Sequence, residues 1–473
     1  MRRLAAGVLL PGFGGTVLSE SLAARLRDGL AGVCLFGRNI DSAEQVRSLT
    51  VAIRAARPEA VVAADEEGGD VTRLHMPDGS PEPGNAVLGR IDDESVTAAS
   101  AARIGAELAA AGITLDLAPT VDVNTNDDNP VIGVRSFGLD AALVARHTRA
   151  WVQGLQSSGV AACAKHFPGH GDTAVDSHLG LPVVEHDLDA LRARELVPFV
   201  AALDAGVAAV MTSHIMLPRL DPDSPATMSP RILTGLLREE LGFEGVIVTD
   251  ALDMAGSSAE IGIPAAAVRS LQAGADLLCL GSDSEPVLDA VLDAIVTAVG
   301  SGELPEERLR DAAARVRSLA HRPVGREIVD SFDVAPAAAA ALADGGDWAV
   351  VHLASEPNAA VGPTGWGPFA AAAVDPTSWP AVRFLSWRRI DLDDGSRAVP
   401  EAGARVLVIG RDIHRRPAAR AVVEGLRAAG GTVVVVDMGW PSADRRYADV
   451  ATFGASRAIG AALLHLLTGT EGH

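Results

Sequence analysis

One stretch of the sequence concentrates side chains that can transfer protons. Residues 165–178 read KHFPGHGDTAVDSH and place three histidines, two aspartates and one lysine directly after an apolar run. Among the 40 lysines and arginines of the chain, Lys165 is the only lysine. A compact ammonium group can donate to hydroxyls without the planar geometry that a guanidinium demands. The stretch therefore indicates a functional loop whose first residue can bind hydroxyl groups.

The same loop could hold a divalent metal that activates water, which would make the protein a different class of enzyme. His166 and His170 have the spacing of a zinc-binding pair, but Pro168 and Gly169 lie between them. The two histidines therefore cannot share one helical face, as they do in zinc peptidases. We expect no catalytic metal and no cofactor.

Eight short apolar runs, each ending in polar residues and followed by a helical pattern, surround this loop in the sequence. The runs are 5–10, 31–36, 60–64, 113–118, 161–164, 207–212, 245–249 and 275–280. Amphipathic stretches between them include 43–57, 98–111, 140–157, 189–205, 230–241 and 285–300. This alternation is typical of βα units, and eight units in about 300 residues predict an α/β protein with a (β/α)8 TIM barrel. A doubly wound sheet is the alternative.

Polar side chains follow several of these runs at the point where each predicted strand ends. They are Asp65-Glu66-Glu67 after the third run, Lys165-His166 after the fifth, Ser213-His214 after the sixth and Asp250 after the seventh. The carboxyl ends of barrel strands meet at one mouth, where the active sites of this fold lie. We therefore expect these side chains to converge.

The pattern changes beyond about residue 325. Strand-like runs at 405–409 and 432–437 are flanked by helical patterns at 415–429 and 453–468. We predict a barrel domain over residues 1–325 and a smaller α/β sandwich domain over residues 326–473. The second domain shows no group of residues suited to catalysis.

Composition excludes several classes of protein. The 61 acidic residues exceed the 40 basic ones by 21, so nucleic acid and anionic membrane surfaces would be repelled. The three cysteines stand singly in apolar runs, which predicts reduced core residues rather than disulfides. The N-terminus resembles a signal peptide only superficially, and no run approaches the roughly 20 apolar residues of a membrane span. We expect a cytoplasmic protein with a small-molecule substrate and no evident protein partner.

Four motifs resemble glycoside hydrolase family 3, in its bacterial β-N-acetylglucosaminidase branch that serves cell-wall recycling. They are KHFPGHGDTAVDSH, DEEGGDVTR (65–73), VIGVRSFG (131–138) and VIVTDALDM (246–254), and the likeness covers roughly residues 5–320 in the right order. YADVATFGASRA (447–458) is similar to the second domain of two-domain members. The resemblance implies a (β/α)8 barrel that hydrolyses terminal β-linked sugars with retention of configuration.

The resemblance also implies catalytic roles. Asp250 becomes the nucleophile that forms a covalent glycosyl-enzyme, with Asp253 as a rival because Ala251 stands where the family often has a second acidic residue. His178 becomes the general acid/base, and Asp176 orients it. The carboxylate of Asp176 should raise the pKa of His178 above its usual value of about 6.5.

Substrate binding in the family falls on five further positions of this chain, with a sixth left open. The positions are Asp65, Arg73, Arg135, Lys165 and His166, and the open one is His214, which could line the pocket or bind a buried backbone carbonyl. Asp65 and Arg73 could instead form an ion pair, and Arg135 could tie loops together.

The resulting hypothesis is an exo-β-N-acetylglucosaminidase that acts on peptidoglycan fragments or chitin-type oligosaccharides. Within the family, phosphate could replace water as the acceptor, or the sugar could be glucose or xylose. A barrel that binds sugar without cleaving it is the alternative from another class.

Overall fold

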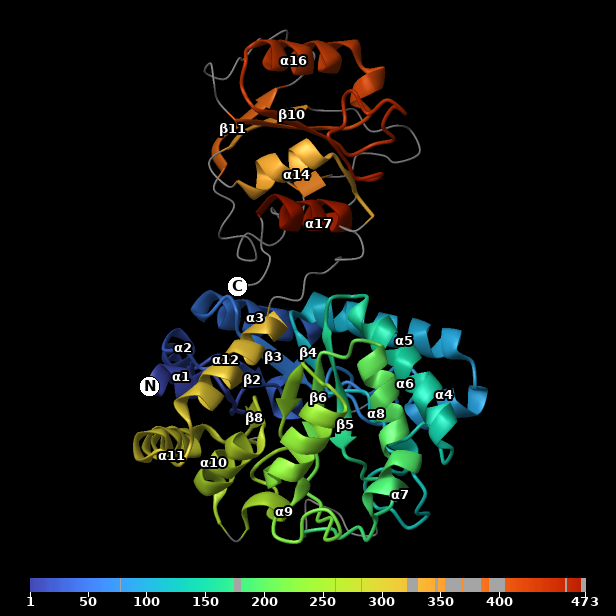
Figure 1. Ribbon diagram of the computed structural model, residues 1–473, viewed down its shortest axis with the longest axis vertical. Helices are drawn as coiled ribbons and strands as arrows, with labels where there is room; N and C mark the ends of the chain where they lie inside the picture. The colour runs from blue at the N-terminus through green and yellow to red at the C-terminus, as the bar shows by residue number, and fades with distance from the viewer. Residues whose placement is uncertain are drawn as a thin grey trace. The chain divides into compact units, whose positions relative to one another are not determined.

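The computed structural model describes residues 1–76, 78–173, 180–259, 261–281, 283–320, 331–344, 348–353, 367–368, 384–390, 405–455 and 457–468. The chain divides into two compact units, Met1–Arg322 and Pro323–His473 (Figure 1). Each unit has its own apolar clusters, so we treat the two separately.

Eight parallel strands form the barrel of the first unit. They are β1 (Leu9–Leu10), β2 (Gly32–Cys34), β3 (Val61–Ala64), β4 (Leu115–Asp116), β5 (Ala161–Phe167), β6 (Ala209–Thr212), β7 (Val246–Val248) and β8 (Leu278–Cys279). Strands β2 to β7 pair in chain order, and β1 pairs with β8. Backbone hydrogen bonds join the two sheets at both edges, from Cys34 N–H to Pro11 and from Thr249 N–H to Leu277. The predicted TIM-barrel fold is confirmed.

Helices follow the strands and cover the outside of the barrel (Figure 1). The longer ones are α2 (Glu20–Arg27), α3 (Ala43–Ala56), α5 (Glu94–Ala111), α6 (Ala141–Gln156), α8 (Leu196–Asp204), α10 (Ile263–Ala273), α11 (Leu288–Ser301) and α12 (Glu306–Ala320). The shorter ones are α1 (Arg2–Ala6), α4 (Asn85–Ile91), α7 (Leu188–Ala193) and α9 (Ala255–Ser258), together with the π-helical segment η4 (Arg231–Glu240). Ser42 and Asp140 cap the N-termini of α3 and α6 by accepting backbone N–H groups.

The first predicted strand begins too early. Residues 5–10 were expected to form it, but Ala5 and Ala6 belong to helix α1 and only Leu9–Leu10 pair in the sheet. A short apolar run with alanine fits a buried helix as well as a buried strand, so its periodicity could not separate the two.

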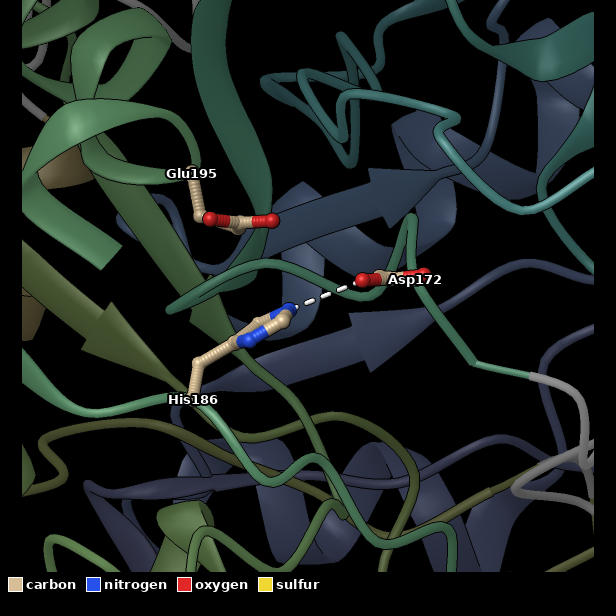
Figure 2. A group of neighbouring side chains, drawn as sticks. All are labelled: Asp172, His186 and Glu195. Carbon is tan, nitrogen blue, oxygen red and sulfur yellow. Dashed lines mark hydrogen bonds and ion pairs between the residues drawn. The ribbon is translucent and has the colours of Figure 1, made fainter. Parts of the chain in front are cut away.

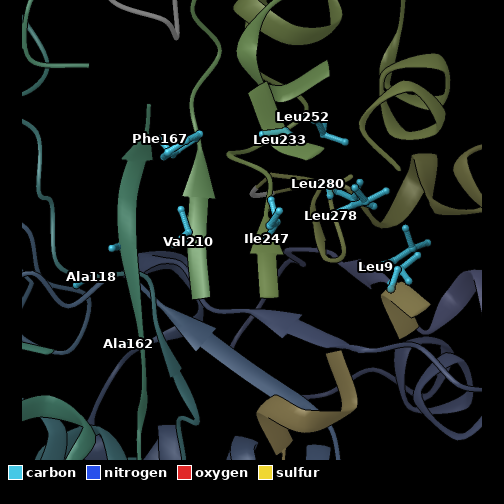
Figure 3. Packing of buried hydrophobic residues seen from close by; sticks show 14 of the residues in the cluster. Leu9, Ala118, Ala162, Phe167, Val210, Leu233, Ile247, Leu252, Leu278 and Leu280 are labelled. Carbon is cyan, nitrogen blue, oxygen red and sulfur yellow. The ribbon is translucent and has the colours of Figure 1, made fainter. Parts of the chain in front are cut away.

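The strands bury both faces, as parallel strands do. Side chains such as Ala162, Val210 and Ile247 point outward to the helices (Figure 3). Alternate side chains such as Cys163 and Val248 fill the barrel interior. Because most strand residues are apolar, charged groups such as Asp116 and Lys165 lie near the carboxyl ends of the strands.

The second unit is a three-layer α/β sandwich. Its strands are β9 (Asp333–Val334), β10 (Trp348–Leu353), β11 (Phe384–Ile390), β12 (Val406–Gly410), β13 (Val433–Asp437) and β14 (Val450–Ala451). They pair in the order β11-β10-β12-β13-β14-β9, and only β9 is antiparallel to its neighbour. Helix α16 (Pro417–Ala428) packs on one face, and α17 (Arg457–Thr468) with α14 (Pro336–Ala343) packs on the other.

Across the described ranges, we find no helix that is both long and apolar enough to cross a bilayer. The three cysteines, Cys34, Cys163 and Cys279, are buried and unpaired by disulfides.

Candidate active site

A cavity of about 460 Å³ lies at the carboxyl ends of the barrel strands. Asp65 follows β3, Lys165 and His166 lie near the end of β5, and Asp250 follows β7. All four line this cavity. A second hollow of about 510 Å³ lies at the amino ends of β6 and β7, and among the described residues that line it only Asp204 and Glu244 are charged. We take the smaller cavity as the candidate active site, because more ionisable side chains line it.

Lys165 lies at the centre of a buried ionic cluster. Its Nζ is 2.8 Å from Asp65 Oδ1 and 2.6 Å from Glu67 Oε1, and its side chain is 2% exposed. Burial alone would lower the pKa of Lys165, but the two carboxylates outweigh it and raise that pKa. Burial likewise opposes ionisation of Asp65 and Glu67, but nearby cations hold both pKa values below their usual range. Lys165 is therefore a fixed ammonium donor at the cavity wall.

Two arginines extend this cluster along the same wall. Arg73 contacts Asp65 Oδ2 at 3.0 Å, and Arg135 forms a bidentate pair with Glu67 at 2.8 and 3.0 Å. The pairing of Asp65 with Arg73 is the ion pair considered above as an alternative to sugar binding. Both residues line the cavity, so the pair and a substrate-binding role are compatible.

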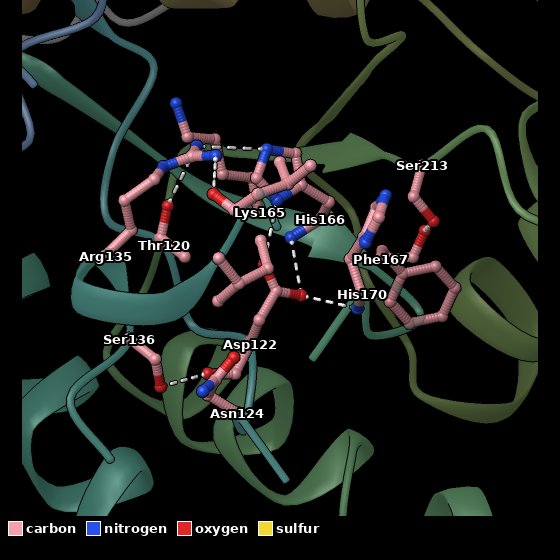
Figure 4. Close-up of polar contacts among 12 residues, drawn as sticks. Thr120, Asp122, Asn124, Arg135, Ser136, Lys165, His166, Phe167, His170 and Ser213 are labelled. Atoms are coloured by element: carbon pink, nitrogen blue, oxygen red, sulfur yellow. Dashed lines mark hydrogen bonds and ion pairs between the residues drawn. The ribbon is translucent and has the colours of Figure 1, made fainter. Parts of the chain in front are cut away.

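His166 is held against Asp122, a residue that the sequence analysis did not single out. Its Nδ1 is 2.8 Å from Asp122 Oδ2, and Arg135 approaches its Nε2 at 3.5 Å (Figure 4). A guanidinium can only donate, so this geometry assigns the proton to Nδ1 and leaves Nε2 as an acceptor at the cavity. Asp122 is 1% exposed, and its Oδ1 accepts the His170 backbone N–H at 2.7 Å. The carboxylate therefore fixes both the His166 ring and the loop that follows.

Two glycines allow that loop to lie close to its neighbours. A Cβ on Gly171 would lie 1.9 Å from the carbonyl oxygen of Val123, next to Asp122. Gly169 has a φ of +129°, and a Cβ there would lie 2.6 Å from Cγ of Glu195. Glycine is therefore needed at both positions: at Gly171 because the Val123 backbone lies too close for a side chain, and at Gly169 because of its positive φ and the neighbouring Glu195 side chain.

Asp250 presents a partly buried carboxylate to the cavity. Its Oδ1 accepts the Ala251 N–H at 2.8 Å. Burial favours the neutral acid, but electrostatic interactions with His166 and His214 and the hydrogen bond from the Ala251 N–H lower the pKa of Asp250. The carboxylate is therefore ionised at neutral pH. Asp253 lies at the rim of the same cavity and is exposed.

His214 does not line the cavity and is fully buried. Its Nε2 donates to the carbonyl of Ala251 at 3.0 Å, and its Nδ1 is 2.9 Å from Thr227 Oγ1. Of the two alternatives for this histidine, the observed contact is the one with a buried backbone carbonyl. The geometry points to a role in positioning the Asp250 turn.

Asp176 and His178 lie outside the described residues, but the two chain segments that flank them are held together. Asp172 Oδ2 is 2.8 Å from His186 Nε2 (Figure 2). Arg194 contacts Asp172 at 2.9 Å and also pairs with Glu195. We call Asp172, His186, Arg194 and Glu195 the loop clasp. Asp172, His186 and Glu195 have the ligand types of a metal site, but the Arg194 guanidinium already supplies positive charge among them.

The described residues therefore bring most of the predicted site together. Around one cavity lie Asp65, Arg73, Arg135, Lys165, His166 and Asp250. Glu67, which was expected at the same mouth but was given no role, also lines the cavity. Asp122, which sequence reasoning missed, holds His166 without lining the cavity. Glu67 stands beside Asp65 in a strand-end acidic triplet, whereas Asp122 follows its strand by six residues and gave no such signal.

Comparison with known proteins gives a family match over the barrel. Residues 17–319 match the family described as "Glycosyl hydrolase family 3 N terminal domain". Among curated relatives, Beta-hexosaminidase A of Pseudoalteromonas piscicida is 37% identical over 330 residues, which cover 64% of this chain and 54% of that protein. The chain thus spans about half the length of that relative. Beta-hexosaminidase of Stenotrophomonas maltophilia (strain K279a) is 40% identical over 278 residues, covering 57% of this chain and 82% of that protein.

Solved structures show the same likeness. A glycoside hydrolase family 3 β-N-acetylglucosaminidase from Paenibacillus sp. str. FPU-7 matches with a TM-score of 0.65 and 30% identity, covering 99% of this chain and 96% of that chain. NagZ from Neisseria gonorrhoeae, solved in complex with N-trifluoroacetyl-D-glucosamine, matches with a TM-score of 0.56 and 33% identity, covering 67% of this chain and 98% of that chain.

Proposed function

This chain belongs to glycosyl hydrolase family 3, and we propose that it is a retaining exo-β-N-acetylglucosaminidase. The observation that carries the proposal is the ionised Asp250 carboxylate in the same cavity as the Lys165 cluster and His166. Relatives named beta-hexosaminidase and β-N-acetylglucosaminidase support the choice of sugar.

In the proposed first step, an Asp250 oxygen attacks the anomeric carbon of the terminal sugar. The glycosidic C–O bond breaks, and His178 gives its proton to the departing oxygen. In the second step, water attacks the same carbon and gives a proton to His178, while the bond to Asp250 breaks. Two displacements restore the original configuration, so the product is the β-anomer. No cofactor enters either step.

The Lys165 cluster is proposed to bind the ring hydroxyls. Lys165, Arg73 and Arg135 are donors, and Asp65 can accept from a hydroxyl at the same wall. Because each of these groups is already held by an ion pair, little ordering entropy is lost when the sugar binds. His166 is proposed to contact the substrate through Nε2, since Asp122 holds Nδ1.

We also propose that the natural substrate is a peptidoglycan fragment or a chitin-type oligosaccharide with a non-reducing β-linked N-acetylglucosamine. The proposed location is the cytoplasm, which is consistent with three cysteines that form no disulfide. Cell fractionation with an antibody to the chain tests the location.

The activity is tested with p-nitrophenyl N-acetyl-β-glucosaminide and with the corresponding glucoside and xyloside. We expect the N-acetyl substrate to be cleaved fastest and the β-anomer to appear first by NMR. The same assay with added phosphate distinguishes the acceptors, because phosphorolysis would yield sugar 1-phosphate. Sugar binding without release of p-nitrophenol from any substrate would leave a non-catalytic barrel and reject the proposal.

A further inference from the structure

Two of the three cysteines lie in the wall of the sugar cavity and have no part in the proposed chemistry. Cys34 ends β2 and Cys279 ends β8, and both line the cavity. Strand β1 lies between these two strands: Cys279 is in register with Leu10, and Cys34 N–H donates to Pro11. Cys34 belongs to the cluster that fills the barrel interior, and Cys279 is buried and faces the same cavity. Their side chains thus point inward at the same level of the barrel.

The two thiols are neighbours. Both line one cavity from strands that flank β1, and the proximity of Cys279 together with burial raises the pKa of Cys34. Cys34 is fully buried and Cys279 is 3% exposed. The thioether of Met211 lines the same cavity. Soft sulfur atoms therefore line a cavity whose other polar groups carry hard oxygen and nitrogen atoms.

Paired thiolates prefer soft metal ions, and a linear two-coordinate ion needs no further ligand. We propose that Cys34 and Cys279 form a binding site for a soft, two-coordinate metal ion at the wall of the sugar cavity. With Hg²⁺ as the probe, two S–H bonds break, two S–Hg bonds form and two protons leave to solvent. The product carries no net charge, so it adds no uncompensated charge to a buried site. An ion bound here occupies part of the cavity and competes with the sugar, a consequence that rests on the proposed function.

Cys163 provides a matched control within the same chain. It lies on β5, faces the barrel interior and is fully buried, but it does not line the cavity. Burial raises the pKa of Cys163, and the charged groups that act on its thiol are Lys165 and carboxylates rather than a second thiol. Cys163→Ser therefore removes one buried cysteine without changing the proposed pair.

The test loads the full chain with one equivalent of Hg²⁺ and then adds an excess of free cysteine. A single thiolate exchanges its metal with the competitor, whereas a pair holds it by chelation. We expect the native chain and Cys163→Ser to retain about one Hg²⁺ by native mass spectrometry. Cys34→Ser and Cys279→Ser should retain at least tenfold less. Equal retention in either of these variants, or loss in Cys163→Ser, would overturn the proposal.

A second measurement needs no variant. Crystals of the native chain soaked in Hg²⁺ should show one anomalous peak between the sulfurs of Cys34 and Cys279. A peak at another position, with none between these sulfurs, would contradict the proposed site. Competition is measured separately, as a lower apparent affinity for N-acetylglucosamine in Hg²⁺-loaded protein. If metal is retained in the expected pattern but the protein binds no sugar, the metal site stands and the proposed function fails.

Discussion

Asp250 and Asp253 lie three residues apart at the same cavity, but only Asp250 is partly buried among histidines. We expect Asp250→Asn to lower kcat on the order of 10⁴-fold or more, because the nucleophile is lost. Asp253→Asn, an equally conservative change, should stay within about tenfold of the native enzyme. Steady-state assays on the p-nitrophenyl substrate measure both. A 2-fluoro or 5-fluoro glycosyl reagent should label Asp250, and labelling of Asp253 would reverse the assignment.

Lys165 should matter for stability as well as for binding. Replacing it with methionine leaves Asp65 and Glu67 without their shared cation, which should cost about 3 kcal/mol of unfolding free energy at pH 7. Arg310→Met removes an exposed helical pair with Glu306 and should cost less than about 0.5 kcal/mol. Urea unfolding of both variants measures the difference. A cost for Lys165→Met no larger than that of the control would show that the cluster does not stabilise the fold.

The pH dependence of this stabilisation follows from the directions of the pKa shifts. The lowered pKa values of Asp65 and Glu67 mean that their contribution is present above about pH 4 and is lost as the pH falls through the lowered values. The raised pKa of Lys165 means that its contribution is complete below about pH 10.5 and is lost as the pH rises further. Lys165→Met should therefore unfold in acid at a higher pH than the native chain.

Single site residues could be predicted from the sequence where their type was rare or where they stood at the end of a predicted strand. Lys165 was recognisable as the only lysine, and Asp65 and Asp250 directly follow apolar runs. Asp122 lies several residues beyond its strand, and its importance depends on the folded path of the 165–173 segment over Val123. A contact of that kind has no signature in local sequence.

The loop clasp joins elements on either side of the segment that contains Asp176 and His178. Arg194→Ala removes contacts to Asp172, His186 and Glu195 at once. We expect kcat to fall about tenfold on glycosides whose leaving group requires protonation, and less on p-nitrophenyl substrates, because positioning of the general acid is affected. Comparing the two substrate classes measures this effect.

Arg192 offers a matched control two residues away. It pairs with Glu240 and Asp189 on the surface and has no contact with the clasp. Arg192→Ala should leave both substrate classes unchanged. Equal losses on the two classes in Arg194→Ala would indicate a general structural effect and count against the positioning role.

Most barrel elements could be predicted from periodicity, because each strand is short, apolar and followed by an amphipathic helix. The ends of the strands were predicted less accurately. Strand β5 continues through Lys165 and His166 to Phe167, three residues beyond the apolar run that predicted it. Polar residues inside a strand contradict the pattern expected for a buried strand, and here they are the residues of the site. In the second unit, β12 and β13 were recognisable as valine-rich runs, whereas the short β9 and β14 gave no signal.

At the scale of the whole molecule, every residue of the candidate cavity belongs to Met1–Arg322. The structure of NagZ from Neisseria gonorrhoeae is matched along 98% of its length by 67% of this chain. We therefore expect a chain ending at Arg322 to fold and to retain kcat within about tenfold of the full protein. Circular dichroism and the p-nitrophenyl assay test the two parts separately. A folded but inactive fragment would show that the second unit contributes to catalysis.

Because Lys165 is the only lysine and is buried, proteolytic cleavage after it can be used to measure unfolding of the barrel. An endoproteinase that cuts after lysine has a single target bond, Lys165–His166, and that bond lies within β5 with the lysine side chain 2% exposed. Cleavage into fragments 1–165 and 166–473 therefore requires the barrel to open, and its rate at low protease follows the population of the opened form. A bound sugar that stabilises the cavity should slow this one cut in proportion to its occupancy. Gel electrophoresis of two bands would then give ligand affinity without any enzymatic assay.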